Sequence, residues 1–500
     1  MKFLLILLCA GAILVSARSA SGQSQALAEK AQHAKELMAA GKPDQAVPIY
    51  RELVQALPNN PGLMLNLGLA LDMAGRKPEA VREYQAVLKL DPNHYPALLL
   101  LGTAYLDLGQ PAKALDPLER SLKVQPERAE AQETLAEAQL ALGRLDEARH
   151  RLQALSQSDP SNPKVWYGLG ACYERLAQQN FDDLAKVAPG SAYWLDLVAE
   201  SRLETKQDYA AFYFYHQALA QMPSLRGIHA ALADVYKDTG HPDWAAVEEK
   251  KERQLPPPDC ARQKLECEFQ AGDFPALIEA TETAKSPEAY YWRTRAFNKL
   301  ALDAYFRLGQ LPASMETFEL KAKIESKRRQ NADAAKDWRE ALRLAPGDRY
   351  IQKELALALA QSGDFEGART LLLGLLQQQP DAADLNYFLG DTVLGAQKPQ
   401  EAISYLEKAV HADPQLLPAQ RSLGLAYMQV GQAAQAIPHL KQALPIDQDG
   451  SLHYQLGRAY QAQGERELAS TMIKQYQEMQ RSHQAESQQV EKEVALTPPQ

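Results

Sequence analysis

The sequence predicts an all-α fold, in which helix–turn–helix hairpins repeat along the chain and stack into a superhelical solenoid. Three observations predict it: a motif that recurs about every 34 residues from residue 27 onward, apolar residues spaced as on one helix face, and a glycine that divides each copy. Self-similarity at a period of roughly 20 to 50 residues is typical of repeat architectures. Glycine after an apolar-periodic segment favours a helix end.

The composition is that of an ordinary folded protein. The chain has 500 residues, of which 46% are apolar and 23% charged, and its formal net charge is −9. This apolar content excludes a disordered chain, and the acidic balance argues against nucleic-acid binding by phosphate neutralisation. Length alone predicts about three compact domains of roughly 150 residues each, an estimate that the repeats replace with one elongated core.

The N-terminus has the pattern of an export signal. Lys2 precedes an unbroken apolar run over residues 3–15, and small residues follow up to Gly22. This order predicts a secretory signal peptide over residues 1–22 and an exported protein, periplasmic or secreted. The alternative is an uncleaved N-terminal membrane anchor. The run is shorter than the roughly 20 residues needed to span a bilayer, which favours cleavage.

Each repeat copy carries the same residue types at the same places. Residues 61–94 contain Leu67, Gly68, Leu71, Gly75, Ala80, Tyr84, Leu88 and Pro92. Residues 95–128 contain Leu101, Gly102, Tyr105, Gly109, Ala114, Leu118, Leu122 and Pro126. Small residues let two helices approach closely, a glycine with positive φ ends the first helix, and the proline stops the second. One hairpin cannot bury its own apolar face, so neighbouring copies must stack.

These residues resemble the tetratricopeptide repeat, because eight positions agree in type between adjacent copies. The resemblance covers about nine-tenths of the chain after the signal. It divides the chain into an N-terminal block (27–162), a divergent middle (163–314) and a C-terminal block (315–482). Residues 483–500 have little apolar periodicity and end with two prolines before Gln500, so they are expected to form a disordered tail.

The sequence contains no motif of a zinc protease, a P-loop or a nucleophile elbow. Gly168 and Gly170 belong to the repeat pattern and not to a dinucleotide-binding loop, which needs a third glycine and a preceding strand. Asp447, Asp449 and Gly450 favour a turn between helices over a metal site, because a calcium loop needs more oxygen ligands. We therefore expect no enzymatic activity, no cofactor and no bound metal.

Two cysteines of the middle block, Cys260 and Cys267, can form a disulfide only if they do not lie on the same helix. On one helix, Cys260 and Cys267 would have Cα atoms about 10 Å apart at 1.5 Å per residue, beyond the roughly 7 Å limit for a disulfide. A disulfide therefore requires Cys260 to lie in a loop before the helix begins, and both the bonded and the free state stay open. Cys172 is expected to be a buried apolar residue.

Aromatic residues concentrate in two windows of the middle block, residues 193–215 and 290–306. Exposed aromatic side chains are common anchors of protein interfaces. Bulkier core packing, at the place where the repeat register shifts, is the interpretation that we favour.

The resemblance implies that the first helix of each hairpin lines the inner face of the solenoid. In the N-terminal block this gives an apolar set, suited to an amphipathic helix or an apolar peptide, or to packing on neighbouring helices: Leu65, Leu69, Met73, Leu99 and Leu106. In the C-terminal block it gives a mixed set, suited to polar or acidic peptides: Tyr350, Lys353, Tyr387, Asp391, Arg421, Tyr454 and Arg458.

The sequence thus predicts a non-catalytic scaffold that binds proteins or peptides. The carboxylate-clamp version of the family is disfavoured, because Ala31 and Lys35 stand where Lys and Asn are wanted, and Pro96 and Leu100 replace a basic pair. Two alternatives are an assembly factor that docks a membrane complex of the cell envelope, and a non-catalytic subunit of an envelope enzyme.

Overall fold

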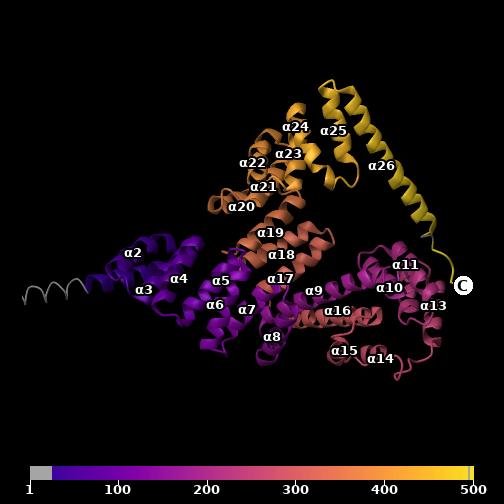
Figure 1. Cartoon of the computed structure of the whole chain (residues 1–500), viewed down its shortest axis with the longest axis horizontal. Helices are drawn as coiled ribbons and strands as arrows, with labels where there is room; N and C mark the ends of the chain where they lie inside the picture. The colour runs from indigo at the N-terminus through magenta and orange to yellow at the C-terminus, as the bar shows by residue number, and fades with distance from the viewer. Residues whose placement is uncertain (1–24, 494–495, 500) are drawn as a thin grey trace, which may run out of the picture. The chain divides into compact units, whose positions relative to one another are not determined.

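The computed structural model describes residues 25–493 and 496–499, and all regular structure in these residues is helical (Figure 1). The predicted signal peptide lies outside the described residues. The chain divides into two compact units, Met1–Cys172 and Tyr173–Gln500, which are considered separately below.

The first unit is a stack of helical hairpins that confirms the predicted fold class. Residues 25–39 form its first described helix. The following helices pair in order and then lead into α9, which continues into the second unit: α2 (Pro43–Ala56), α3 (Pro61–Met73), α4 (Lys77–Leu90), α5 (Tyr95–Asp107), α6 (Pro111–Val124), α7 (Ala129–Ala141), α8 (Leu145–Ser158) and α9 (Pro163–Val187).

The hairpin of α3 and α4 shows how the repeat residues build each unit. The Asn60 side chain accepts a hydrogen bond from the Leu63 amide and caps the start of α3. Gly75 ends the helix with φ +75°, a conformation that costs glycine little. Tyr84 is fully buried against Gly68, where an added Cβ atom would lie 2.5 Å from the tyrosine ring. The small residue is therefore required for the two helices to pack.

The second unit begins with the middle block. Two hairpins are followed by two short helices and one long helix: α10 (Ala192–Glu204), α11 (Asp208–Gln221), α12 (Ile228–Asp238), α13 (Pro242–Gln254), α14 (Lys264–Gln270), α15 (Phe274–Thr281) and α16 (Pro287–Gln310).

Regular hairpins return after α16 and run to the last helix (Figure 1). They are α17 (Met315–Lys327), α18 (Asn331–Leu344), α19 (Arg349–Gln361), α20 (Phe365–Gln378), α21 (Ala383–Gly395), α22 (Pro399–Ala412), α23 (Leu417–Gln429), α24 (Ala433–Ala443) with the short 3-10 helix η1 (Leu444–Ile446), α25 (Ser451–Ala462) and α26 (Arg466–Glu493).

The two aromatic windows of the middle block pack against each other. The rings of Tyr193 and Tyr291 have centroids 4.7 Å apart, and Trp292 lies 5.1 Å from Phe269. Tyr291 is fully buried and Trp292 is 4% exposed. These side chains form the core that joins α10, α14 and α16, so at this place the aromatic residues serve packing.

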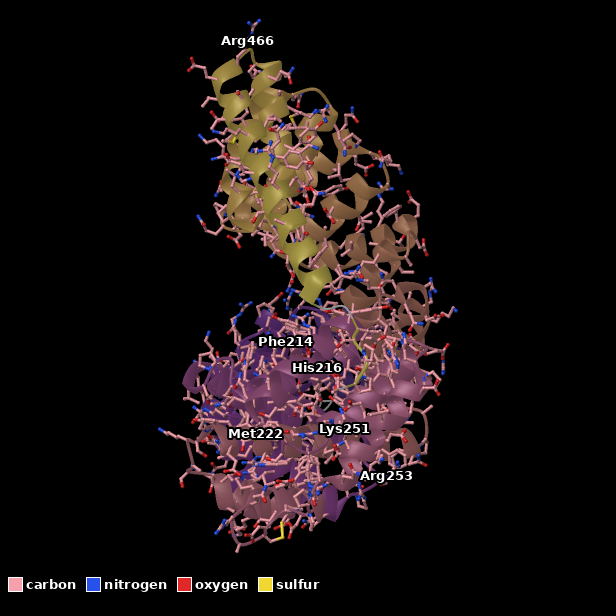
Figure 2. All side chains as sticks on the ribbon, turned by 90° about the vertical axis from the view of Figure 1, so that its right-hand side faces the viewer. Phe214, His216, Met222, Lys251, Arg253 and Arg466 are labelled. Atoms are coloured by element: carbon pink, nitrogen blue, oxygen red, sulfur yellow. A yellow bond between two sulfur atoms is a disulfide. The ribbon has the colours of Figure 1, made fainter. Side chains whose placement is uncertain are left out.

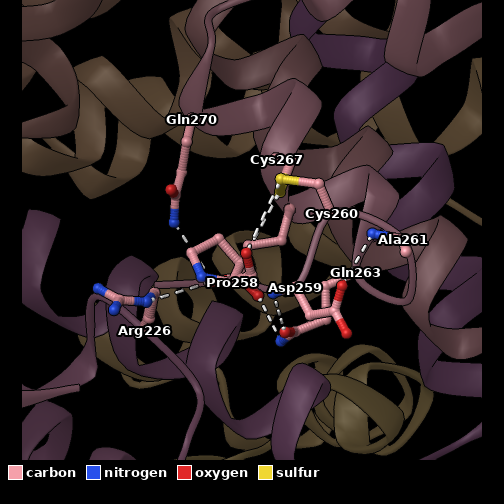
Figure 3. The surroundings of a disulfide bond; sticks show 9 residues. Arg226, Pro258, Asp259, Cys260, Ala261, Gln263, Cys267 and Gln270 are labelled. Atoms are coloured by element: carbon pink, nitrogen blue, oxygen red, sulfur yellow. Dashed lines mark hydrogen bonds and ion pairs between the residues drawn. A yellow bond between two sulfur atoms is a disulfide. The ribbon is translucent and has the colours of Figure 1, made fainter. Parts of the chain in front are cut away.

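The disulfide geometry follows from where α14 begins (Figure 3). Cys260 lies in the loop after Pro258, and Cys267 lies on α14, which starts at Lys264. The Cα atoms are therefore 5.7 Å apart, and the two sulfur atoms are bonded. Cys172 is buried, and its Sγ donates a hydrogen bond to the Leu145 carbonyl oxygen.

The C-terminal end differs from the irregular tail expected from residue 483. Helix α26 continues to Glu493. The segment after residue 482 is rich in Glu, Gln, Lys and Ala, which are strong helix formers even without an apolar face. Apolar periodicity detects helices that bury one face, so it could not detect a helical extension whose sequence has no apolar face.

Candidate functional site

The first helices of the C-terminal hairpins present one row of side chains, Lys353, Tyr387, Arg421 and Tyr454, which we call the inner row. These residues are 33 or 34 positions apart and lie on α19, α21, α23 and α25. Each of these helices packs on the next one, so the four side chains belong to one continuous surface. The row alternates between a cation and an aromatic ring.

At one end of the inner row, Tyr350 extends the aromatic surface. It is 43% exposed, and its ring packs edge-on against Trp338 at a centroid distance of 6.0 Å. Lys323 Nζ lies 5.4 Å from the centre of the Tyr350 ring, within the range of a cation–π contact. Lys353 Nζ lies 3.8 Å from Asp384 Oδ2 on the next first helix. This end therefore combines an accessible ring with two ammonium groups.

The centre of the inner row is electrostatically coupled. Burial raises the pKa of Tyr387, Asp391 raises it further, and Arg421 lowers it, so both charges act on the Tyr387 hydroxyl. Ser422 donates a hydrogen bond of 2.7 Å to Asp391 Oδ1, which fixes this carboxylate between α21 and α23. Arg421 is exposed. In the described part of the chain its guanidinium group has no ion-pair partner and remains available for an acidic ligand.

The other end of the inner row is formed by α25. Tyr454 is 41% exposed, and its ring lies 5.4 Å from that of Tyr476 on α26. Arg458, one helical turn further along, is exposed. Like Arg421, it makes no ion pair with any other described residue. An arginine beside an aromatic ring is a combination enriched in protein interfaces.

The apolar set of the N-terminal block is mostly part of the packed interior. Leu99 is 6% exposed and belongs to one core cluster with Leu118 and Leu135. Leu65 packs against the neighbouring core, and Leu69 and Leu106 are half-buried. Met73 alone among the five is largely exposed, at 57%. These side chains favour the packing alternative over an apolar groove.

The first unit contains a hollow of about 440 Å³, which lies away from these five residues. It is bounded by α4, α5 and α6, and its lining includes Gln85, Lys89, Tyr105 and Lys113. None of the five predicted apolar residues lines it. Tyr105 and Gln85 share a hydrogen bond of 2.8 Å, so the amide of Gln85 and the hydroxyl of Tyr105 already bind each other.

Sequence reasoning missed Lys323 and Glu319. Both lie on α17, where Lys323 Nζ pairs with Glu319 Oε1 at 2.8 Å. In the repeat copy that contains α17, Lys321 stands where most other copies have leucine, so this first helix does not show the repeat pattern. Counting from residue 315 places Lys323 at the ninth position, which Asp391 and Arg458 occupy in their own copies.

The loop between η1 and α25 is held by side chains of the chain itself. Gly450 precedes α25 with φ +77°, and the imidazole of His453 contacts Asp447 Oδ2 at 2.6 Å. Within residues 25–485, no three His, Cys, Asp or Glu side chains are grouped so that they could hold a metal ion.

Stacked helical hairpins with a shared row of accessible polar side chains define the class of repeat solenoids that serve protein interactions. Models of the tetratricopeptide repeat match the chain in overlapping segments, which together cover more than half of it: residues 32–95, 78–136, 109–172, 319–383, 353–416, 393–455 and 450–483. The chain therefore belongs to the tetratricopeptide repeat family. Such proteins are generally non-catalytic scaffolds and typically bind proteins or peptides.

Solved structures with a similar fold include three repeat proteins. MamA from Desulfovibrio magneticus RS-1 is 24% identical, with 34% of this chain and 96% of that chain covered at a TM-score of 0.31. A tetratricopeptide repeat protein from Parabacteroides merdae ATCC 43184 is 15% identical, with 67% and 99% covered at 0.33. YrrB, described as having an unusual peptide-binding site, is 20% identical, with 33% and 87% covered at 0.29.

The comparison with curated proteins gave no match. In the described residues, no helix combines the length and the apolar character needed to cross a membrane.

Proposed function

We propose that this protein is an exported, non-catalytic scaffold that binds an extended acidic peptide along the inner row of its C-terminal block. The observation that carries the proposal is the alternation of cations and aromatic rings along the inner row. The row runs over the first helices of four successive hairpins, which pack on one another. Arginine and lysine suit carboxylates, and the rings of Tyr387 and Tyr454 offer apolar area at low entropic cost. The unpaired guanidinium groups of Arg421 and Arg458 support an acidic rather than a basic partner.

A displayed library of random peptides tests this proposal on the full chain. We expect the selected peptides to be enriched in Asp and Glu, and their binding to weaken with salt, because exposed charges are screened. Arg421→Glu is expected to reverse the preference or to abolish binding. Arg343→Glu is the matched control, since its side chain is 66% exposed on α18, a second helix. Equal binding by both variants would contradict the proposal.

Export is the second part of the proposal, and two features support it. The apolar run at residues 3–15 suits a signal peptide, and a bonded Cys260–Cys267 pair suits an oxidising compartment. Fractionation of cells that express the full chain separates the alternatives. A freely soluble exported protein supports a scaffold, whereas tight association with membranes supports an assembly factor or an envelope enzyme's subunit.

A further inference from the structure

A tyrosine at the eleventh repeat position makes the same kind of contact in two repeats. The hydroxyl of Tyr105 accepts a hydrogen bond from Gln85, and the hydroxyl of Tyr427 donates one to Glu407. In both cases the partner lies 20 residues earlier, on the second helix of the preceding hairpin. The tyrosine thus links adjacent repeats.

Tyr236 occupies the same position but departs from this pattern. The residue 20 positions earlier is His216, yet the Tyr236 hydroxyl donates a hydrogen bond of 2.6 Å to the carbonyl oxygen of Thr497. The buried Nε2 atom of His216 has no hydrogen-bond partner among the described residues. The link between repeats is therefore replaced by a contact with the C-terminal end of the chain, 261 residues away.

The surroundings of Tyr236 suit a short proline-containing segment. Its ring lies 5.7 Å from that of Phe212 and 5.6 Å from that of Trp244, both edge-on. Proline-rich segments adopt an extended helix without internal hydrogen bonds, and aromatic grooves recognise them while polar groups bind their free carbonyls. The C-terminal segment ends Leu-Thr-Pro-Pro-Gln, and it offers such a carbonyl to Tyr236.

The exposure of the C-terminal segment is consistent with docking by one face. Leu496 and Pro499 are half-buried, whereas Thr497 and Pro498 are exposed. His216 lies on the face of the second unit that Figure 2 presents, together with Lys251. Charges near His216 include Glu248, which forms an ion pair with Lys251 at 2.8 Å and lies 2.5 Å from the imidazole of His229. None of these charged groups is left unpaired at the surface where the apolar C-terminal segment would bind.

We propose that the surface of α11 and α12 around Tyr236 and His216 is an intramolecular docking site for the chain's own C-terminal segment, Leu496–Pro499. The segment follows α26, so docking attaches the end of the last helix to the middle block of the same unit. The site is distinct from the inner row, and the two proposals can fail independently.

A photo-crosslinking residue at position 497 tests the docking in the full chain. The Thr497 side chain is exposed and only its carbonyl makes the bond, so replacing the side chain leaves the contact intact. We expect a crosslink within one chain to residues 208–244, with a yield that does not change on dilution. Lack of a crosslink to α11 or α12 overturns the proposal, as does a crosslinked dimer whose yield rises with concentration.

Substitution of the tyrosine gives the second readout. Tyr236→Phe should lower the ratio of docked to free segment about fivefold, the effect of losing one ordinary hydrogen bond. Tyr427→Phe makes the same change at the same repeat position, and it should leave the crosslink unaltered. Leu496→Asp places a charge on a half-buried side chain of the segment and leaves every repeat residue unchanged. It should also reduce the crosslink. Equal yields in all variants would refute the assignment.

Discussion

The hydroxyl group of Tyr291 donates a hydrogen bond of 2.6 Å to Asp196 Oδ2 and joins α16 to α10 across 95 residues of sequence. Both side chains are buried, at 0% and 2% exposure. Arg295 completes the network, with Nη1 donating to the Tyr291 hydroxyl and Nη2 donating to Glu200, each at 2.5 Å. Buried charges are tolerated only when they are paired and hydrogen-bonded. This network therefore fixes how the divergent middle block packs.

The first prediction concerns the Tyr291 hydroxyl. Tyr291→Phe leaves a buried carboxyl group without its donor, so we expect α10 and α16 to lose about 1 to 3 kcal/mol of local stability. Hydrogen exchange of the amides of these helices measures the change. Tyr215→Phe is the control, because its hydroxyl is buried without a partner in the described structure. Similar losses in both variants would show that the hydrogen bond is not the cause.

The second prediction is a pH dependence with a defined sign. Burial and the nearby Glu200 raise the pKa of Asp196, whereas Arg295 and the hydrogen bond from Tyr291 lower it. The resulting pKa is about 7. A carboxyl group with a higher pKa in the folded state binds its proton more tightly there. Its contribution to stability is therefore complete below the unfolded pKa of about 4 and is lost as the pH rises through 7.

We accordingly expect the stability of α10 and α16 to fall between about pH 4 and about pH 7. One group contributes at most about 1.4 kcal/mol per pH unit. Asp196→Asn keeps an acceptor for Tyr291 but cannot titrate, so its stability should vary less with pH over the same range. Hydrogen exchange, corrected for the intrinsic pH dependence, measures both proteins. An unchanged slope in the variant would assign the pH dependence to other groups.

The hairpins were predictable because each special residue has a local task at a fixed place. Gly75 and Gly109 both take positive φ, at +75° and +68°, and each follows the end of a first helix. The inner row was predictable for the same reason, since equal spacing on packed helices places Lys353, Tyr387 and Arg421 on one surface. Periodic sequence signals therefore predicted the fold, and they also predicted which first-helix side chains share one surface in the C-terminal block.

The non-periodic contacts could not be predicted. Tyr291 lies outside the repeat register, and a pair far apart in sequence leaves no local pattern. Leu99 fits the inner-face position by number, yet it is buried with Leu118 and Leu135, because a leucine there can also fill the space between hairpins. Position within the repeat indicates the direction of a side chain but not how closely the next helix covers it.

The third prediction concerns the disulfide between Cys260 and Cys267. The bond closes a loop of about eight residues, for which chain entropy gives a stabilisation of about 2 to 3 kcal/mol. We expect residues 255–286 to exchange hydrogen faster in Cys260→Ser, whereas α19 to α25 stay unchanged. Cys172→Ser is the control for sulfur removal, since that cysteine takes part in no disulfide. Alkylation of both Cys260 and Cys267 in the purified, unreduced exported chain would contradict the bonded state.

The fourth prediction contrasts two glycines on neighbouring helices of the C-terminal block. A Cβ atom on Gly390 would lie 2.6 Å from Leu406 Cγ, whereas one on Gly374 would meet nothing within 4 Å. Gly390→Ala should therefore destabilise the chain by about 1 to 3 kcal/mol through overpacking. Gly374→Ala should stabilise it by about 0.5 to 1 kcal/mol, because alanine is the better helix former. Urea unfolding followed by circular dichroism measures both changes. Because the substitution is identical, effects of equal sign would show that helix propensity, not the α21–α22 contact, governs these positions.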